Sequence, residues 1–275
     1  MSKDLTIIVV EYFSRPHLDT LAKSIRTFEP ELPVIVSSNS NYDVSAQKQM
    51  AQDFPETQWL HNGKNLGYAG AVNRALSKVA TPYAVILNPD VELVELFADK
   101  TRSIFESNQQ LAIFGPRILD GKGVATFSFR RFYLPSYIMS RYLGIVPGVT
   151  KKKINDYYLM ADSSREQFTY ADWVSGGAMF VRMAAVKAAG RMDERYFLYM
   201  EDVDWCRLFW SKGWRVAYHP EIKVIHRAQH QNTRGGLWHA LSPATRHHFM
   251  SYLKYLMKWG LNKYNPADDF NKKLN

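Results

Sequence analysis

The sequence predicts an α/β fold in which a mainly parallel central sheet carries helices on both faces. With 275 residues, 46% of them hydrophobic, the chain can build one large core. Short apolar runs alternate with longer helical patterns through the first 120 residues or so, which is typical of strand–helix units. A helical pattern near the C-terminus predicts an extension outside that alternation. In such Rossmann-like, doubly wound sheets, ligands bind beyond the carboxyl ends of the strands.

The elements follow from hydrophobic periodicity, taken in chain order. Strands are expected at 5–12, 33–38, 57–61, 82–88, 111–118, 172–182, 214–218 and 222–225. Helices are expected at 17–28, 45–54 and 68–79, from just after Glu92 to about 106, and at 201–212 and 243–259. Residues 120–171 show no clean period. They predict a flexible insertion that covers a site, and a solvated surface loop is the alternative.

The charge of the chain is uneven. Its net charge is +9, and the segment from Lys223 to the C-terminus holds nine Lys or Arg against two Asp. An anionic partner follows, which can be a membrane surface, a phosphorylated substrate or nucleic acid; no nucleic-acid-binding motif supports the last. The single cysteine, Cys206, forms no internal disulfide, and no apolar run reaches the length of about 18 residues that a membrane span needs. With no recognisable signal peptide, these features predict a cytoplasmic protein.

The segment Asn88-Pro89-Asp90 follows an apolar strand and places a carboxylate at the edge of the sheet. A hard divalent cation can be held by one carboxylate together with a diphosphate and waters. Asp90 is therefore a candidate metal ligand. An Asx-type turn that caps the next element explains the same residues equally well.

A loop-to-helix junction at residues 65–74 combines small residues with Asn. The backbone there can approach a ligand closely, and a helix N-terminus favours negative charge. The glycine spacing matches neither a Walker loop nor the dinucleotide fingerprint. Dehydrogenase and P-loop kinase functions are therefore disfavoured.

Two glycines, Gly176 and Gly177, interrupt an apolar strand, which predicts that another group presses close to the backbone there. Further along, Glu201, Asp202 and Asp204 open a helix whose dipole favours ionised carboxylates. A carboxylate of this kind can take a proton from a hydroxyl group. An ordinary acidic first turn is the structural alternative.

His226 follows the last expected strand and is a candidate metal ligand, although a lone histidine is more often a partly buried polar residue. The spacing of His and Cys matches no zinc signature, and the chain contains no Gly-x-Ser-x-Gly elbow.

The order of these segments resembles the inverting glycosyltransferases of family 2, and among them the rhamnosyltransferase-like enzymes of bacterial surface polysaccharides. The resemblance runs from about Leu5 to Thr233. It implies a GT-A fold with a C-terminal helical extension. Asn88-Pro89-Asp90 stands where the family has Asp-x-Asp, so only the second carboxylate is present. The Gln-x-x-Arg-Trp motif of processive synthases is absent from the sequence.

The resemblance also assigns roles to residues. Asp202 is implied as the catalytic base, and Asp90 and His226 as ligands of Mg²⁺ or Mn²⁺. The implied acceptor-binding residues are Trp173, Gly176, Gly177 and Glu201. The implied nucleotide-sugar-binding residues are Val10, Glu11, Tyr12, Ser14, Ser38, Asn39, Asn65, Gly67, Tyr68, Asn88 and Asp90.

The expected organisation is a catalytic domain at 1–235 followed by a basic, amphipathic helical extension at 236–275. Residues 1–95 would form the nucleotide-binding half and residues 96–235 the acceptor-binding half. The expected reaction is metal-dependent transfer of L-rhamnose from dTDP-L-rhamnose to a saccharide or a polyprenyl-diphosphate-linked saccharide. UDP- or GDP-sugar donors, and an inactive nucleotide- or carbohydrate-binding homologue, are the alternatives. The extension would either pack on the core or rest on the inner face of the cell membrane.

Overall fold

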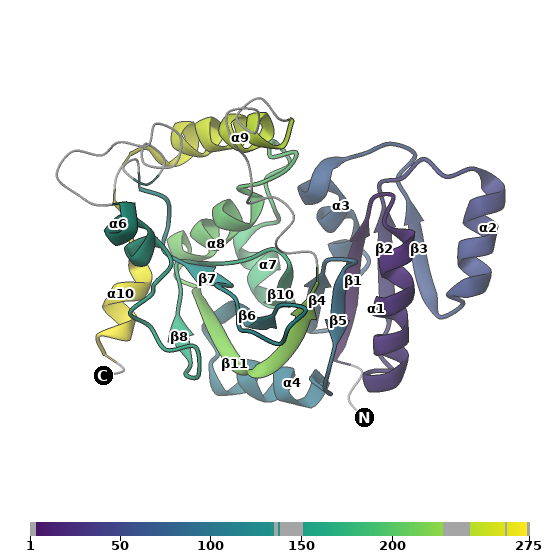
Figure 1. Ribbon diagram of the computed structural model, residues 1–275, viewed down its shortest axis with the longest axis horizontal. Coiled ribbons are helices and arrows are strands. Elements are labelled where there is room, and N and C mark those ends of the chain that lie inside the picture. The colour runs from purple at the N-terminus through teal and green to yellow at the C-terminus, as the bar shows by residue number, and fades with distance from the viewer. Residues whose placement is uncertain (1–3, 135–136, 138–150, 228–242, 262, 274–275) are drawn as a thin grey trace.

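The computed structural model describes residues 4–134, 137, 151–227, 243–261 and 263–273, and over these residues its centre is a nine-stranded sheet (Figure 1). The strand order is β3-β2-β1-β4-β10-β6-β11-β5, and β8 pairs with β11. Four of the eight strand pairs in this sheet are parallel, and the four pairs that involve β10, β5 and β8 are antiparallel. The strands of this sheet are β1 (Leu5–Glu11), β2 (Val34–Ser38), β3 (Thr57–His61), β4 (Tyr83–Leu87), β5 (Val91–Leu93), β6 (Leu111–Leu119), β8 (Thr169–Tyr170), β10 (Ala178–Arg182) and β11 (Arg215–His226).

Helices cover both faces of the sheet, which explains why β1, β4 and β10 are buried along their whole length. On one face, α1 (Arg15–Phe28), α2 (Val44–Asp53) and α4 (Ala98–Ser107) enclose a core with the inner strands. On the other face, α3 (Gly67–Leu76), α7 (Met183–Ala189) and α8 (Glu201–Ser211) enclose a second core. The predicted α/β architecture is confirmed.

Three expected elements differ from the prediction. The single strand expected at 172–182 is two strands: β9 (Trp173–Val174) pairs with β7 (Phe129–Arg130) in a small separate sheet, and β10 joins the main sheet. The two strands expected at 214–225 are one strand, β11, with a register shift around Pro220, which has no N–H to donate. The segment after Asp90 first forms β5, so that α4 begins only at Ala98.

The described parts of the expected insertion at 120–171 are packed into the protein at some positions and exposed at others. Phe129, Phe132, Tyr158 and Met160 are buried in the core that also contains α8, so a solvated loop is the wrong interpretation around these residues. Residues 121–124, in contrast, are exposed. Tyr158 ends α6 (Lys151–Tyr158). Residues 135–136 and 138–150 of the insertion lie outside the described residues.

The C-terminal extension consists of α9 (Pro243–Trp259) and α10 (Pro266–Asn271), and α9 packs on α8. Tyr252 and Tyr255 are buried in the core. Lys258 Nζ lies 2.7 Å from Asp204 Oδ2, and Trp259 Nε1 donates to Asp204 Oδ1 at 2.6 Å. The expected domain boundary at 235/236 lies outside the described residues. In the part of the chain that the structure describes, no helix has both the length and the apolar character of a bilayer span.

Candidate active site

The backbone at Gly176 holds the side chain of Asp202. The Gly176 N–H donates to Asp202 Oδ2 at 3.0 Å, and the Tyr68 hydroxyl donates to the Gly176 carbonyl at 2.7 Å. A Cβ atom at position 176 would lie 3.4 Å from Asp202 Oδ2 and 3.7 Å from the Tyr68 hydroxyl. These are ordinary contact distances, so the two hydrogen bonds, rather than a missing side chain, hold α8 and α3 at the same point of the backbone.

The next residue, Gly177, lies against the ring of His226. A Cβ atom at position 177 would lie 3.0 Å from His226 Cε1, closer than side-chain packing normally allows. The Gly177 carbonyl also accepts a hydrogen bond of 3.0 Å from the Asn88 N–H. The prediction that another group presses on these glycines is confirmed. Together, Gly176 and Gly177, here called the glycine pair, bring the start of α8 beside the ends of β4 and β11.

The start of α8 carries two adjacent carboxyl groups in different environments. Tyr199 and Met200 adopt left-handed backbone conformations (φ 66° and 71°) just before the helix, a strained arrangement of the kind found at functional sites. Burial, followed by the charge of Asp202, raises the pKa of Glu201 well above its ordinary value. Burial therefore favours the neutral form of the Glu201 carboxyl, whose Oε2 has no hydrogen-bond partner among the described residues.

Asp202 is the member of this pair that can serve as a base. Burial raises its pKa, while the N–H groups of Gly176 and Val203 and the charge of Arg130 lower it, and the net shift is upward. The two N–H groups that donate to the Asp202 carboxylate stabilise its ionised form, whereas Glu201 Oε2 has no such donor among the described residues. These contacts favour Asp202 over Glu201 for proton abstraction.

Asp90 and His226 form the second polar pair. His226 Nε2 lies 3.0 Å from Asp90 Oδ1, and His226 Nδ1 is buried without a partner in the part of the chain that is described. Burial would raise the pKa of Asp90, but the hydrogen bond and the charge of His226 outweigh it, so that the pKa is lowered and the carboxylate stays ionised.

These two side chains fit the protein's share of a divalent-cation site. One ionised carboxylate and one imidazole are suitable donors for Mg²⁺ or Mn²⁺. Among the described residues, no group of three or more His, Cys, Asp or Glu side chains gathers as a metal cage. Mg²⁺ commonly takes one or two carboxylates and completes its shell with substrate phosphates and water. Asp90 and His226 therefore suit a cation that arrives with a diphosphate.

At the ends of β1 and β2, the carboxylate of Glu11 is fully buried and surrounded by internal donors. It accepts hydrogen bonds from the Ser14 N–H at 2.9 Å, from the Ser38 hydroxyl at 2.6 Å, from the Ser40 hydroxyl at 2.9 Å and from the Tyr42 hydroxyl at 3.0 Å. Glu11 thus joins the two strand ends and the loop after β2. Ser40 and Tyr42 belong to this network, although no sequence pattern singled them out.

Asn39 is also buried and fully engaged. Its Nδ2 donates to the Gly67 carbonyl at 3.0 Å, and its Oδ1 accepts from Asn62 Nδ2 at 2.8 Å and from the Leu66 N–H at 3.2 Å. Four of the expected nucleotide-binding residues are therefore buried in the structure that surrounds the strand ends. They are Val10, Glu11, Ser38 and Asn39.

Tyr12 differs from these buried neighbours, because its side chain is 54% exposed at the end of β1. The ring of Phe13, 61% exposed, meets it edge-on with centroids 4.9 Å apart. Ser14 is half-buried beside them, and its hydroxyl has no partner among the described residues. Aromatic rings with free faces are suitable for stacking on a nucleobase.

The junction at Asn65–Tyr68 is pinned to the loop before α8. Gly67 has a φ of 74°, and a Cβ atom there would lie 2.5 Å from the Phe197 carbonyl oxygen, so only glycine fits. The Tyr68 N–H donates to that carbonyl at 2.9 Å, and Asn65 Oδ1 accepts from the Gly67 N–H at 2.9 Å. The start of α3 and the start of α8 are thereby held together.

Arg130 is a residue of this region that the sequence prediction missed. Its guanidinium lies over the ring of Trp173, 4.9 Å from the centroid, and its charge acts on Asp202. Trp173 itself is buried, and its Nε1 donates to the Arg131 carbonyl at 2.9 Å. The Trp173 ring thus packs against the guanidinium of Arg130 and holds it in place. Arg130 lies in the aperiodic insertion, where no sequence signal distinguishes it from other basic residues.

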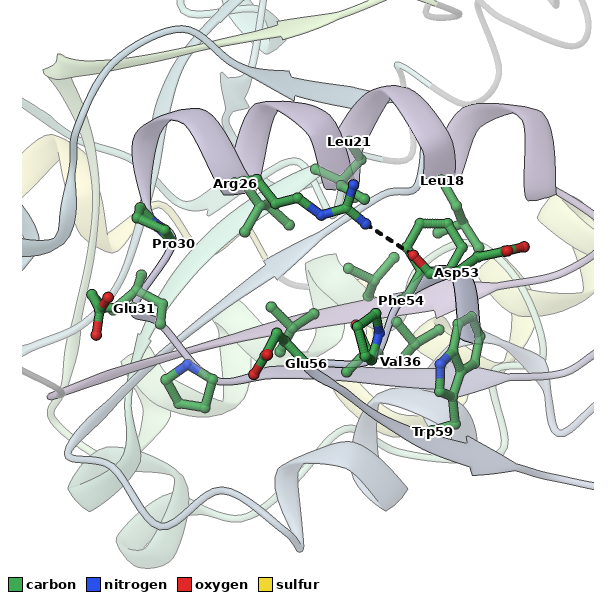
Figure 2. Close-up of a pocket in the computed structure, with 18 of the residues that line it drawn as sticks. Leu18, Leu21, Arg26, Pro30, Glu31, Val36, Asp53, Phe54, Glu56 and Trp59 are labelled. Atoms are coloured by element: carbon green, nitrogen blue, oxygen red, sulfur yellow. Dashed lines mark hydrogen bonds between the residues drawn. The ribbon is translucent and has the colours of Figure 1, made fainter. Parts of the chain in front are cut away.

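A pocket of about 950 Å³ opens elsewhere, between α1 and α2 (Figure 2). Leu18, Leu21, Val36, Phe54 and Trp59 contribute to its apolar lining, and Arg26 donates to the Asp53 carbonyl at its rim. None of the expected site residues lines it. It belongs to the face of the sheet opposite α8 and carries no carboxylate pair of the kind found at the glycine pair.

Curated relatives match most of this chain. An N-acetylglucosaminyl-diphospho-decaprenol L-rhamnosyltransferase from Mycobacterium tuberculosis is 26% identical over 92% of this chain and 84% of its own length. The rhamnosyltransferase WbbL of Escherichia coli K12 is 26% identical over 92% of each chain.

Solved structures with low sequence identity share the fold. The mannosyltransferase PcManGT from Pyrobaculum calidifontis, solved with GDP-Man and Mn²⁺, superposes with a TM-score of 0.60 at 14% identity, over 96% of this chain and 66% of that one. GalNAc-T7, solved with UDP, GalNAc and Mn²⁺, superposes with a TM-score of 0.63 at 13% identity; this chain spans 48% of its length.

These structural neighbours are GT-A glycosyltransferases, and the superpositions show that this chain shares their fold. The profile of the glycosyltransferase-like family 2 matches residues 4–260. This chain therefore belongs to glycosyltransferase-like family 2.

Proposed function

We propose that this glycosyltransferase moves L-rhamnose from dTDP-L-rhamnose to a lipid-linked saccharide, with inversion at the anomeric carbon. The observation that carries the proposal is the glycine pair, which connects Asp202 on one side with Asp90 and His226 on the other. A base and a diphosphate-binding pair must flank the reacting carbon in a single displacement. The two full-length relatives with rhamnosyltransferase names support the choice of sugar.

In the proposed reaction, Asp202 takes the proton of an acceptor hydroxyl. The oxygen then attacks the anomeric carbon, and the bond from that carbon to the diphosphate oxygen breaks as the diphosphate leaves with the electron pair. Arg130, packed on Trp173, keeps Asp202 ionised closer to neutral pH. Burial favours the neutral form of Glu201, which leaves the negative charge of the pair on Asp202. A Mg²⁺ or Mn²⁺ ion held by Asp90 and His226 would supply positive charge for the leaving diphosphate.

The acceptor is proposed as a polyprenyl-diphosphate-linked saccharide, because the name of the mycobacterial relative gives such a compound. The reaction would then occur at the inner face of the cell membrane. Tyr12 is the proposed nucleobase contact from the end of β1, since its ring is free. The solved neighbours with UDP and GDP-Man keep those nucleotides as the alternative donors to test.

The test is a nucleoside-diphosphate release assay with dTDP-rhamnose, UDP-galactose and GDP-mannose, run with a synthetic N-acetylglucosaminyl-diphospho-lipid acceptor. We expect release from dTDP-rhamnose in the presence of Mn²⁺ or Mg²⁺ and its loss on chelation. Release from another donor alone would overturn the choice of sugar. Nucleotide binding without any release would instead indicate an inactive binding homologue, which the Asn at position 88 would explain.

A further inference from the structure

The outer side of α9 carries large apolar side chains that point away from the core. The side chains of Met250, Leu253 and Met257 are 53%, 37% and 79% exposed, and Leu261, just beyond the helix, is 65% exposed. These four residues are here called the α9 stripe. Single exposed apolar residues are ordinary, but a contiguous row of them marks an interaction surface.

The periodicity of the helix explains how one helix can have two apolar sides. Residues 250, 253 and 257 follow the spacing that places side chains on one face, while the buried Tyr252 and Tyr255 fall on the opposite face. The inner face is already occupied by the core that includes α8. Core packing therefore accounts for the aromatic residues of α9 and leaves the stripe unexplained.

The positive charge near the α9 stripe favours an anionic partner. From position 222 to position 267 the sequence contains seven Lys or Arg and no Asp or Glu, and of these Arg227 and Lys258 are paired with carboxylates of the protein. Arg246 is exposed one turn before Met250, and Lys263 is exposed two residues beyond Leu261. An apolar stripe of flexible side chains flanked by basic residues is the composition of a helix that lies in the headgroup region of a bilayer.

The inner face of α9 connects the stripe to the start of α8. Lys254 Nζ donates to the Arg195 carbonyl at 2.6 Å, and the Ser251 hydroxyl donates to the Leu198 carbonyl at 2.9 Å, both in the loop that leads to Asp202. Figure 1 shows α9 along the upper edge of the molecule, directly above α8, whereas the N-terminus lies at the lower edge. A surface that binds the stripe would therefore lie close to the carboxylates at the start of α8.

We propose that the α9 stripe is the membrane-docking surface of this protein, and that it inserts among the headgroups of an anionic lipid bilayer. The proposal concerns lipid binding alone and does not depend on which sugar is transferred. It commits to lipid as the occupant, and a second copy of the chain is an outcome that the experiment can reveal.

The experiment is co-sedimentation of the full chain with vesicles of phosphatidylcholine and phosphatidylglycerol in a 7:3 ratio. The test variant is M250Q/L253Q/M257Q. A matched control, V44Q/L96Q/V124Q, removes three equally exposed apolar side chains from other parts of the surface. We expect the partition coefficient of the test variant to fall about tenfold or more and that of the control to stay within about twofold. Vesicles of phosphatidylcholine alone should bind the parent protein more weakly.

Folding and activity are measured on the same variants. Because the three side chains are exposed, the thermal unfolding midpoint and the transfer to a soluble, short-chain acceptor should match those of the parent. Equal vesicle binding by the parent and the test variant would overturn the proposal, as would absence of binding by the parent. A parent that sediments as a dimer and a test variant that sediments as a monomer would assign the stripe to a second copy and would also overturn it.

Discussion

The end of β1 and β2 and the glycine pair lie at the same edge of the sheet but treat their polar groups in opposite ways. At the first, the carboxylate of Glu11 is surrounded by donors from its own chain, and Asn39 is equally engaged. At the second, His226 Nδ1 and Glu201 Oε2 are buried without partners among the described residues. Unsatisfied buried polar groups are unfavourable for stability, so they are candidates for functional contacts. The comparison gives Glu11 and Asn39 a structural role, and it leaves His226 and Glu201, like the unpartnered hydroxyl of Ser14 beside Tyr12, as candidates for contacts with substrate.

The largest effect in the glycine pair, short of removing a reacting group, is expected from Gly177→Ala. The new Cβ atom would lie 3.0 Å from His226 Cε1 and would displace the ring from Asp90. We expect metal-supported transfer to fall by about 10–100-fold, the range seen when the orientation of a metal ligand is lost. Nucleoside-diphosphate release as a function of Mn²⁺ concentration measures it.

The control for this variant is Gly121→Ala, because nothing lies within 4 Å of a Cβ atom at position 121. It should keep the parent's rate and Mn²⁺ dependence. If Gly177→Ala also keeps both, His226 has no role in binding the cation.

A smaller effect is expected from Arg130→Gln. The charge of Arg130 lowers the pKa of Asp202, so its removal raises that pKa further. Since Asp202 must be ionised to act as a base, the acid limb of the kcat/KM profile should move to higher pH, with a loss of about tenfold below neutrality and little change at high pH. An equal loss of kcat/KM at every pH would instead indicate that Arg130 contacts the substrate directly.

The smallest effect on catalysis is expected from Glu11→Gln, which should act on stability. Replacing one carboxylate oxygen by an NH₂ group removes an acceptor and turns a donor toward donors that remain buried. We expect the free energy of unfolding in urea to fall by about 1–3 kcal/mol, with kcat close to the parent's. Glu56→Gln, at an exposed position, is the control and should change neither quantity. A normal stability combined with weaker donor binding would show that Glu11 faces the nucleotide.

Periodic elements of the fold could be predicted from the sequence, and elements set by tertiary pairing could not. The aliphatic run of β1 and the amphipathic pattern of α1 are local signals. In contrast, the separation of Trp173 and Ala178 into different sheets depends on β7, a strand of two residues inside an aperiodic segment. β5 is equally short and was hidden at the start of an expected helix.

The candidate site shows the same division. Asp202, Gly176, Gly177, Asp90 and His226 were expected as a group, and the structure brings them together. The hydrogen bonds that fill the acceptor positions of the Glu11 carboxylate could not be predicted. Their donors Ser38, Ser40 and Tyr42 belong to β2 and to the loop that follows β2. Likewise, the influence of Arg130 on Asp202 exists only after the chain has folded.

The most direct test of the proposed chemistry compares two adjacent carboxyl groups, in Asp202→Asn and Glu201→Gln, by single-turnover transfer and donor affinity. Because backbone N–H groups stabilise the ionised form of Asp202 and burial favours the neutral form of Glu201, we expect about a thousandfold lower rate in Asp202→Asn and a rate within tenfold of the parent in Glu201→Gln. Donor affinity should be close to the parent's in both variants. Transfer by Asp202→Asn at the parent's rate, or a larger loss in Glu201→Gln than in Asp202→Asn, would contradict the assignment.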